Sequence, residues 1–122
     1  MKKKLKISLG IILVLALAIV SYKLIASNSI KDKIYSHLET IGYTQNDIDN
    51  VEIKHSFINK LLGYNEWRIF VEFESEPDII FAFTYRDKQI IRQGITSKVT
   101  QLDIAEIEEY DSKFDNGELK NN

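Results

Sequence analysis

The sequence contains no cysteine, one proline and five glycines. The absence of cysteine excludes a disulfide-stapled scaffold, a zinc finger of the usual kind and a lipoprotein anchor, each of which needs a thiol. The scarcity of proline and glycine excludes collagen-like repeats and a flexible low-complexity chain. The 122 residues are 44% hydrophobic and 28% charged, so we expect one small folded domain at most.

Acidic side chains are absent from the first 26 residues, which hold five lysines: Lys2, Lys3, Lys4, Lys6 and Lys23. The rest of the chain carries eleven basic and eighteen acidic side chains. That acidic balance disfavours binding to nucleic acid or other polyanions. The two parts are therefore predicted to lie in different surroundings.

Residues 7–22 form an uncharged run with ten Leu, Ile or Val residues among the first fourteen. These ten contribute roughly −3 to −6 kcal/mol toward membrane insertion. A helix over residues 5–26 measures about 33 Å, enough to cross a hydrocarbon core of roughly 30 Å if Lys6 and Lys23 reach the headgroups. We predict that residues 1–26 are cytoplasmic lysines and a single transmembrane anchor, which contacts the lipid bilayer through residues 7–22.

Two other interpretations of this run are a cleaved secretory signal and the buried helix of a soluble fold. A secretory signal is cleaved after a pair of small residues that have one other residue between them. Ala16 and Ala18 have that spacing but lie inside the apolar run, and Leu24 with Ala26 fits it poorly. For an anchor, the positive-inside rule places the N-terminus in the cytoplasm and residues 27–122 outside the cell membrane.

The remaining residues show one helix pattern followed by strand patterns. A stripe of Ile30, Ile34, Leu38 and Ile41 predicts an amphipathic helix that ends at Gly42 and either continues the membrane helix or is separated from it at residues 27–29. Alternation predicts strands over residues 51–57, 67–74, 79–85 and 89–95, the third of them central and covered on both faces. Turns are expected at residues 75–78, which include Pro77, and at residues 86–88.

These elements predict an α+β fold: an N-terminal transmembrane helix, then a helix packed on a three- or four-stranded antiparallel meander, with a short C-terminal helix. Thr100 with Asp103 is expected to start the last helix. The folded domain is predicted over residues 27–110, and the polar residues 111–122 are predicted to form a disordered tail.

No motif in the sequence predicts catalysis, so we expect neither an enzyme nor a cofactor. His37 and His55 are the two histidines, too few for a zinc site without cysteine; His37 is expected to be solvated and His55 to be packed or at a rim. His55 and Ser56 would point to opposite faces of a strand, which argues against a nucleophile and base pair.

The acidic residues Glu72, Glu74, Glu76 and Asp78 alternate along the chain. The first three would share a face and could hold calcium, which makes a calcium-assisted hydrolase the enzyme alternative. A solvated acidic edge that prevents strand-to-strand aggregation explains the same residues without a metal.

The connection over residues 58–67 holds five large apolar residues where polar turn residues are usual. It supplies the candidate partner-binding residues Leu61, Leu62, Tyr64 and Trp67. One interpretation is that Leu61, Leu62 and Tyr64 fold back over the core. The other is an exposed patch that meets a protein partner or the bilayer surface.

We therefore expect a membrane-anchored extracytoplasmic binding or regulatory module with a protein partner at the membrane. The alternatives are the calcium-assisted hydrolase and a secreted effector released by signal cleavage.

The order of these features resembles a family of small N-terminally anchored proteins of low-GC Gram-positive bacteria that is known as a domain of unknown function. The similarity covers residues 1 to about 95: a helix ending at Ile41-Gly42-Tyr43, Asp47-Ile48 before the first strand, and, most specifically, residues 71–85. It implies no catalytic residue, cofactor or substrate. The helix and meander are also similar in architecture to PepSY (cystatin-like) modules, which lie outside Gram-positive membranes and regulate other proteins.

Overall fold

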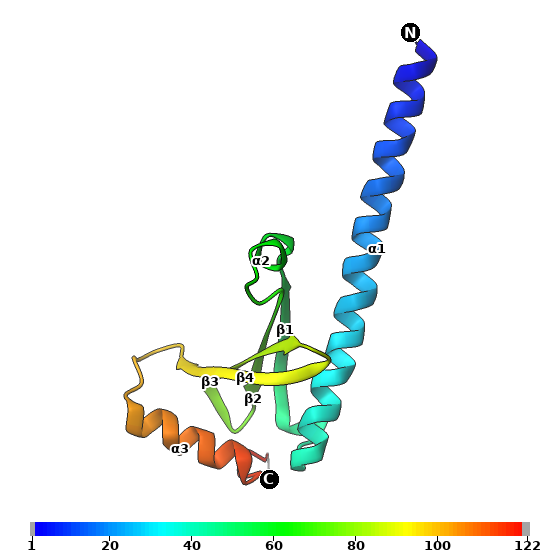
Figure 1. Cartoon of the computed structure of the whole chain (residues 1–122). Coiled ribbons are helices and arrows are strands. Elements are labelled where there is room, and N and C mark those ends of the chain that lie inside the picture. The colour runs from blue at the N-terminus through cyan, green and yellow to red at the C-terminus, as the bar shows by residue number, and fades with distance from the viewer. Residues whose placement is uncertain (1, 121–122) are drawn as a thin grey trace.

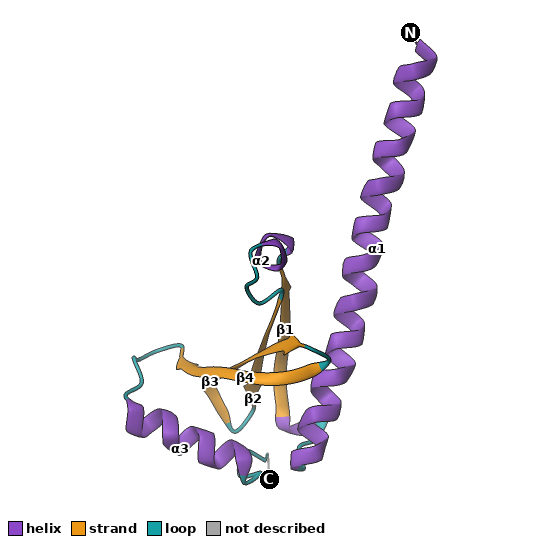
Figure 2. Ribbon diagram, viewed as in Figure 1, coloured by secondary structure: helices purple, strands orange, loops and turns teal. Residues whose placement is uncertain are grey.

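The computed structural model describes residues 2–120. Its elements in chain order are α1 (Lys2–Ile41), the 3-10 helix η1 (Gln45–Asp47), β1 (Ile48–His55), α2 (Phe57–Leu61), β2 (Trp67–Phe73), β3 (Glu76–Arg86), β4 (Gln89–Ser97) and α3 (Ile104–Asp115). Figures 1 and 2 show α1 projecting far beyond a twisted sheet, with α3 below the sheet and away from the projecting part. The predicted α+β class, with a four-stranded sheet between the long helix and a short C-terminal helix, is confirmed.

The sheet is an antiparallel meander with strand order β1-β2-β3-β4. Each strand pairs with the next along the chain, so Val71 lies opposite Val51 on one side and opposite Phe81 on the other, and Phe81 lies opposite Ile95. Residues directly opposite one another share a face. One apolar row therefore crosses all four strands.

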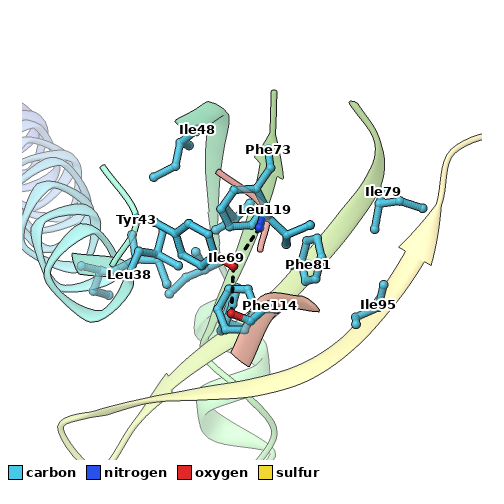
Figure 3. Close-up of a cluster of buried hydrophobic side chains, with 14 of the residues drawn as sticks. Leu38, Tyr43, Ile48, Ile69, Phe73, Ile79, Phe81, Ile95, Phe114 and Leu119 are labelled. Atoms are coloured by element: carbon cyan, nitrogen blue, oxygen red, sulfur yellow. Dashed lines mark hydrogen bonds between the residues drawn. The ribbon is translucent and has the colours of Figure 1, made fainter. Parts of the chain in front are cut away.

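The core forms where two helices cover that apolar face. The predicted stripe of α1 supplies Ile30, Ile34 and Leu38, which are all buried, and α3 supplies Phe114. Figure 3 shows Phe114 among Ile69, Phe81 and Tyr43. Helix α1 contacts β1 and β4, and α3 contacts β4. The domain therefore depends on α1, which supplies part of its core.

Helix α1 is continuous through residues 27–29, so the membrane pattern and the amphipathic stripe belong to one helix of about 60 Å. It ends at Gly42, whose φ of 110° is favoured by glycine. Residues 2–25 are all exposed. Among residues 2–120, α1 is the one helix long and apolar enough to cross a membrane.

Tyr43 joins the end of α1 to the C-terminal part of the domain. Its side chain is 1% exposed, and its hydroxyl donates to the carbonyl oxygen of Phe114 at 2.8 Å and accepts from the N–H of Leu119 at 3.4 Å (Figure 3). Burial raises the pKa of the Tyr43 hydroxyl to about 12. The neutral phenol is therefore part of the folded structure at physiological pH.

The chain beyond residue 110 differs from the predicted disordered tail. Helix α3 begins after Asp103, which accepts the N–H of Glu106 at 2.8 Å, and not at Thr100. It continues to Asp115, and Phe114 and Leu119 are 2% and 1% exposed. These two apolar side chains fill the core, so the domain extends past residue 110 to Leu119; residues 121 and 122 lie outside the described residues.

Two details of β3 also differ from the prediction. The strand begins at Glu76, and Pro77 lies in an irregularity where the pairing shifts between Glu72 and Phe73, so no ladder hydrogen bond is needed from it. Phe81 on one face is buried, whereas Ile80 on the other is only half-buried. Thr84, which follows on the same face as Ile80, is 3% exposed, so the second face is covered in part, while α1 and α3 pack on the first.

Candidate functional site

Residues 56–66, which we call the α2 loop, connect β1 to β2 and include helix α2. Figure 1 shows this loop at the end of the domain that points in the same direction as the projecting half of α1. It contains most of the connection over residues 58–67, in which the sequence has more large apolar residues than a turn usually has. Its position beside α1 makes it the candidate functional site.

The α2 loop has its own local hydrogen bonds. Strand β1 ends at His55, so Phe57, predicted as the end of a strand, instead begins α2. Ser56 caps the helix by accepting the N–H of Asn59 at 3.2 Å, and Gly63, with a φ of 78°, ends it. Both ends of the turn are therefore fixed, which holds its side chains in defined directions.

Four side chains of this loop, which we call the apolar tip, face solvent: Ile58 is 68%, Leu61 85%, Leu62 65% and Tyr64 69% exposed. The interpretation that Leu61, Leu62 and Tyr64 fold back over the core is wrong. Trp67 is 4% exposed, because it begins β2 on the core face. It is therefore not part of an exposed partner-binding patch.

The base of the α2 loop packs against α1. The rings of Phe57 and Tyr22 stack with centroids 5.9 Å apart, and the ammonium of Lys23 lies 5.3 Å from the Phe57 ring centre. Phe57 also borders an almost purely apolar hollow of about 300 Å³, whose other lining residues are Leu15, Ala18, Ile19 and Tyr22. The loop thus lies beside the last turns of the predicted membrane segment.

A polar contact lies under this packing. The Nε2 of His55 is 2.7 Å from Oε1 of Glu66, and the hydroxyl of Tyr22 donates to the same oxygen at 3.5 Å. The His55 ring packs on Trp67 at 4.2 Å and on Phe57 at 4.3 Å, and its side chain is 5% exposed. His55 is therefore packed, as predicted, and links both ends of the α2 loop to α1.

The sequence did not reveal the contact between Tyr22 and Glu66, which lie 44 residues apart. One local signal was available, since Tyr22 is an aromatic residue next to Lys23 at the end of the apolar run, as is common at membrane interfaces. Its partner could be found only from the folded sheet.

The lysines bracket the apolar part of α1. Lys2, Lys3, Lys4 and Lys6 are exposed in its first turns, and Lys23 is exposed beside the α2 loop. From Lys6 to Lys23 the helix rises about 26 Å. Lysines thus lie at both ends of the uncharged segment. The N-terminal lysines contact no other element of the described chain, and Lys23 lies beside the domain.

The acidic residues 72–78 are partly neutralised by lysines. Glu72 pairs with Lys98 at 2.9 Å and Glu76 with Lys113 at 3.8 Å. Residues 74 and 75 form a turn, which breaks the alternation expected there. No group of three His, Asp or Glu side chains able to hold a metal ion occurs within residues 2–120.

His37 was predicted to be solvated, but its side chain is half-buried at the edge of the core. Its ring is edge-on to Phe83, with centroids 6.2 Å apart. Burial, and next the charge of Arg92, lower the pKa of His37. Arg92 in turn pairs with Asp115 at 2.8 Å and Asp111 at 3.2 Å, which joins β4 to α3.

No family model, curated protein or solved structure matches this chain. The resemblances to the anchored Gram-positive family and to PepSY modules therefore stay predictions. The candidate site is argued from the geometry of the α2 loop and α1.

Proposed function

We propose that the protein is a single-pass membrane module that holds an α+β domain against the outer face of the cytoplasmic membrane and acts by binding a protein partner. One observation carries this proposal. The uncharged, mostly apolar residues 7–22 of α1 are exposed, while the same helix continues as part of the core. The apolar half is too large a hydrophobic surface to leave in water, and lipid satisfies it.

The charge distribution supports the orientation. Four lysines precede the apolar segment and one follows it directly. The flank richer in lysine stays in the cytoplasm, so the domain lies outside. Lys31 and Lys33 reduce this bias, which makes orientation the first property to measure.

The pairing of polar groups in the candidate site supports binding over catalysis. The Ser56 hydroxyl is used as a helix cap, and the Nε2 of His55 pairs with Glu66. The Nδ1 of His55 is buried away from any place for substrate and has no hydrogen-bond partner within residues 2–120. A nucleophile in a catalytic site is instead held by a base and faces a place for substrate. These groups stabilise the α2 loop, which is the role they play in the fold.

Topology is tested with single cysteines, which the natural chain lacks. Lys3→Cys and Glu108→Cys, both at exposed positions, are expressed separately in a Gram-positive host. A membrane-impermeant maleimide should label the Glu108→Cys variant in intact cells and the Lys3→Cys variant only after lysis. Labelling of the Lys3→Cys variant alone in intact cells would show the opposite orientation, and recovery of the unmodified chain in the soluble fraction would contradict the anchor.

The binding role is tested by photo-crosslinking from Glu108 and from Arg68, two exposed positions on α3 and on the open face of the sheet. A discrete crosslinked protein from native membranes, absent when the anchor is replaced by a signal peptide, is the expected result. Crosslinks to the bulk of membrane proteins in proportion to their abundance would argue against a specific partner. Mass spectrometry of the mature N-terminus separates the anchored protein from a secreted effector.

A further inference from the structure

The apolar tip of the α2 loop is exposed without a partner in the described chain. Its four side chains are 65% to 85% exposed and follow one another within seven residues. Domains in water rarely expose four large apolar side chains in one short loop where polar residues are usual. The loop is also capped at both ends, so this exposure is built into its conformation.

The position of the loop along α1 gives its depth relative to the membrane. Phe57 stacks on Tyr22 and lines one apolar hollow together with Leu15 and Ile19. Leu15 lies about 10 Å further along the helix than Tyr22, toward the N-terminus. Because α1 crosses the membrane along its own axis, a side chain that reaches these residues lies at or within the lipid boundary.

The polar side chains around the loop fit a headgroup layer. Lys23 and Lys60 are both exposed, and their long stems allow the ammonium groups to reach lipid phosphates while the stems stay in apolar surroundings. Tyr22 and Tyr64 are the aromatic type that gathers at membrane interfaces. Cations, tyrosines and aliphatic side chains thus occur together on the side of the domain that faces the bilayer.

We propose that the α2 loop is a second membrane contact, in which Ile58, Leu61, Leu62 and Tyr64 enter the leaflet on the side of the domain and Lys23 and Lys60 bind its headgroups. The inference rests on the proposed anchor and adds an orientation to it. The contacts of Tyr22 and Phe57 tie the loop to α1, so the two membrane contacts form one rigid unit. The domain then stands at a fixed height and rotation on the membrane.

Lipid is favoured over a protein as the occupant of the tip. A protein partner would have to reach the same depth beside α1, whereas lipid surrounds the helix there in every orientation. Short apolar segments with flanking lysines bind membrane interfaces because they bury apolar area in the lipid and attract anionic headgroups.

The test uses the full chain reconstituted in vesicles of phosphatidylcholine and phosphatidylglycerol. A polarity-sensitive fluorophore is attached to Leu61→Cys, at a residue that is 85% exposed and can carry a label without disturbing the core, and to Ile104→Cys. Ile104 is 76% exposed at the start of α3, which makes it a matched apolar control away from the predicted membrane. Leu13→Cys reports on the anchor, and the fluorescence of buried Trp67 reports on the fold.

The expected result is a blue-shifted emission at residue 61 that brominated acyl chains quench and aqueous iodide does not, with the reverse behaviour at residue 104. Iodide quenching at residue 61 equal to that at residue 104, with the label at residue 13 still quenched by brominated lipid, would overturn the second contact and leave the anchor standing. Protection of residue 61 in native membranes only would also overturn it and assign the tip to a protein partner. Iodide quenching at residue 13 would overturn the anchor and the inference together.

Discussion

The two halves of α1 differ in which of their side chains are buried, although they form one continuous helix. Residues 7–22 are uncharged, mostly apolar around the whole helix and all exposed, whereas from Ile30 onward burial is confined to a stripe that includes Ile34 and Leu38. A helix that is apolar all round needs an apolar solvent, and a helix with one stripe needs one packed neighbour. The comparison teaches that one continuous helix combines a candidate membrane span in its first half with a stripe that packs on the sheet in its second half.

The largest effect is expected in the half that belongs to the domain. Ile34 is fully buried, so Ile34→Ala should lower the free energy of unfolding by about 2 to 5 kcal/mol through lost burial and a cavity. The measurement is chemical unfolding of the full chain in detergent, followed by Trp67 fluorescence. Membrane association should be unchanged, and a loss of association with this variant would break the division of α1 into two halves.

The converse change is Leu13→Arg in the exposed half. An arginine near the centre of the helix in place of leucine should oppose insertion by about 3 to 4 kcal/mol. The variant should shift from the membrane to the soluble fraction or aggregate, as sedimentation after carbonate extraction would show. Leu13→Ala is the control, which should remain in the membrane; equal recovery of the arginine variant there would contradict a lipid-facing Leu13.

The junction of the two halves is tested by Asn28→Pro. Proline inside a helix removes one backbone hydrogen bond and clashes with the preceding turn, at a cost of about 3 kcal/mol. Electron paramagnetic resonance between spin labels at Ile19 and Glu39 should show a broader distance distribution than in the natural chain. Asn28→Ala is the control, and a distribution in the proline variant as narrow as that of the natural chain would mean that the helix at residue 28 does not set the distance between the halves.

Stability at high pH tests the domain through Tyr43, which follows the end of α1. The pKa of this hydroxyl is raised to about 12 in the folded protein, above its unfolded value of about 10. The contribution is therefore complete below pH 10 and is lost as the pH rises toward 12, for a total of about 2 to 3 kcal/mol.

Tyr43→Phe removes this titration and also leaves the carbonyl oxygen of Phe114 without the hydroxyl. It should cost about 1 to 3 kcal/mol at neutral pH and flatten the dependence of stability between pH 10 and 12. Unfolding curves at several pH values check both effects. The same alkaline loss in both proteins would show that another group is responsible.

The smallest effect is expected from His37, on the α1 surface that faces β4 and Arg92. Its pKa is lowered in the folded protein, so the unfolded state binds a proton more readily. Stability should be complete above the unfolded pKa of about 6.5 and should decrease as the pH falls below it. His37→Gln should reduce that decrease in unfolding midpoint, and an identical acid profile in both proteins would contradict the assignment.

Much of the fold could be predicted from the sequence because it depends on local periodicity. The stripe of Ile30, Ile34 and Leu38 predicted one helix with its end at Gly42, and alternation predicted the meander. Helix α3 was only partly predicted, because Phe114 and Leu119 are isolated among polar residues. Their burial depends on the sheet and on Tyr43, which lies more than seventy residues earlier.

The candidate site was predicted less well. The apolar excess of residues 58–64 was visible, but whether these side chains were covered depended on tertiary structure. Trp67 was assigned to the patch although it also alternates with Ile69 and Val71, and the alternation determined its burial. The neighbours of the α2 loop on α1 could not be found from local pattern, since the chain must fold before Tyr22 meets Phe57.

The hydrogen bonds of Tyr43 to Phe114 and Leu119 join residues that the ribosome makes at different times. Ribosomes add about 5 to 20 residues per second, so the end of α1 is made several seconds before the segment that closes over it. During that interval Phe73 and Phe81 lack the cover of Phe114, with the anchor already able to enter lipid. Nascent chains stalled before residue 114 should therefore be bound to the membrane through the proposed anchor yet sensitive to protease, and this stage offers a substrate for folding factors.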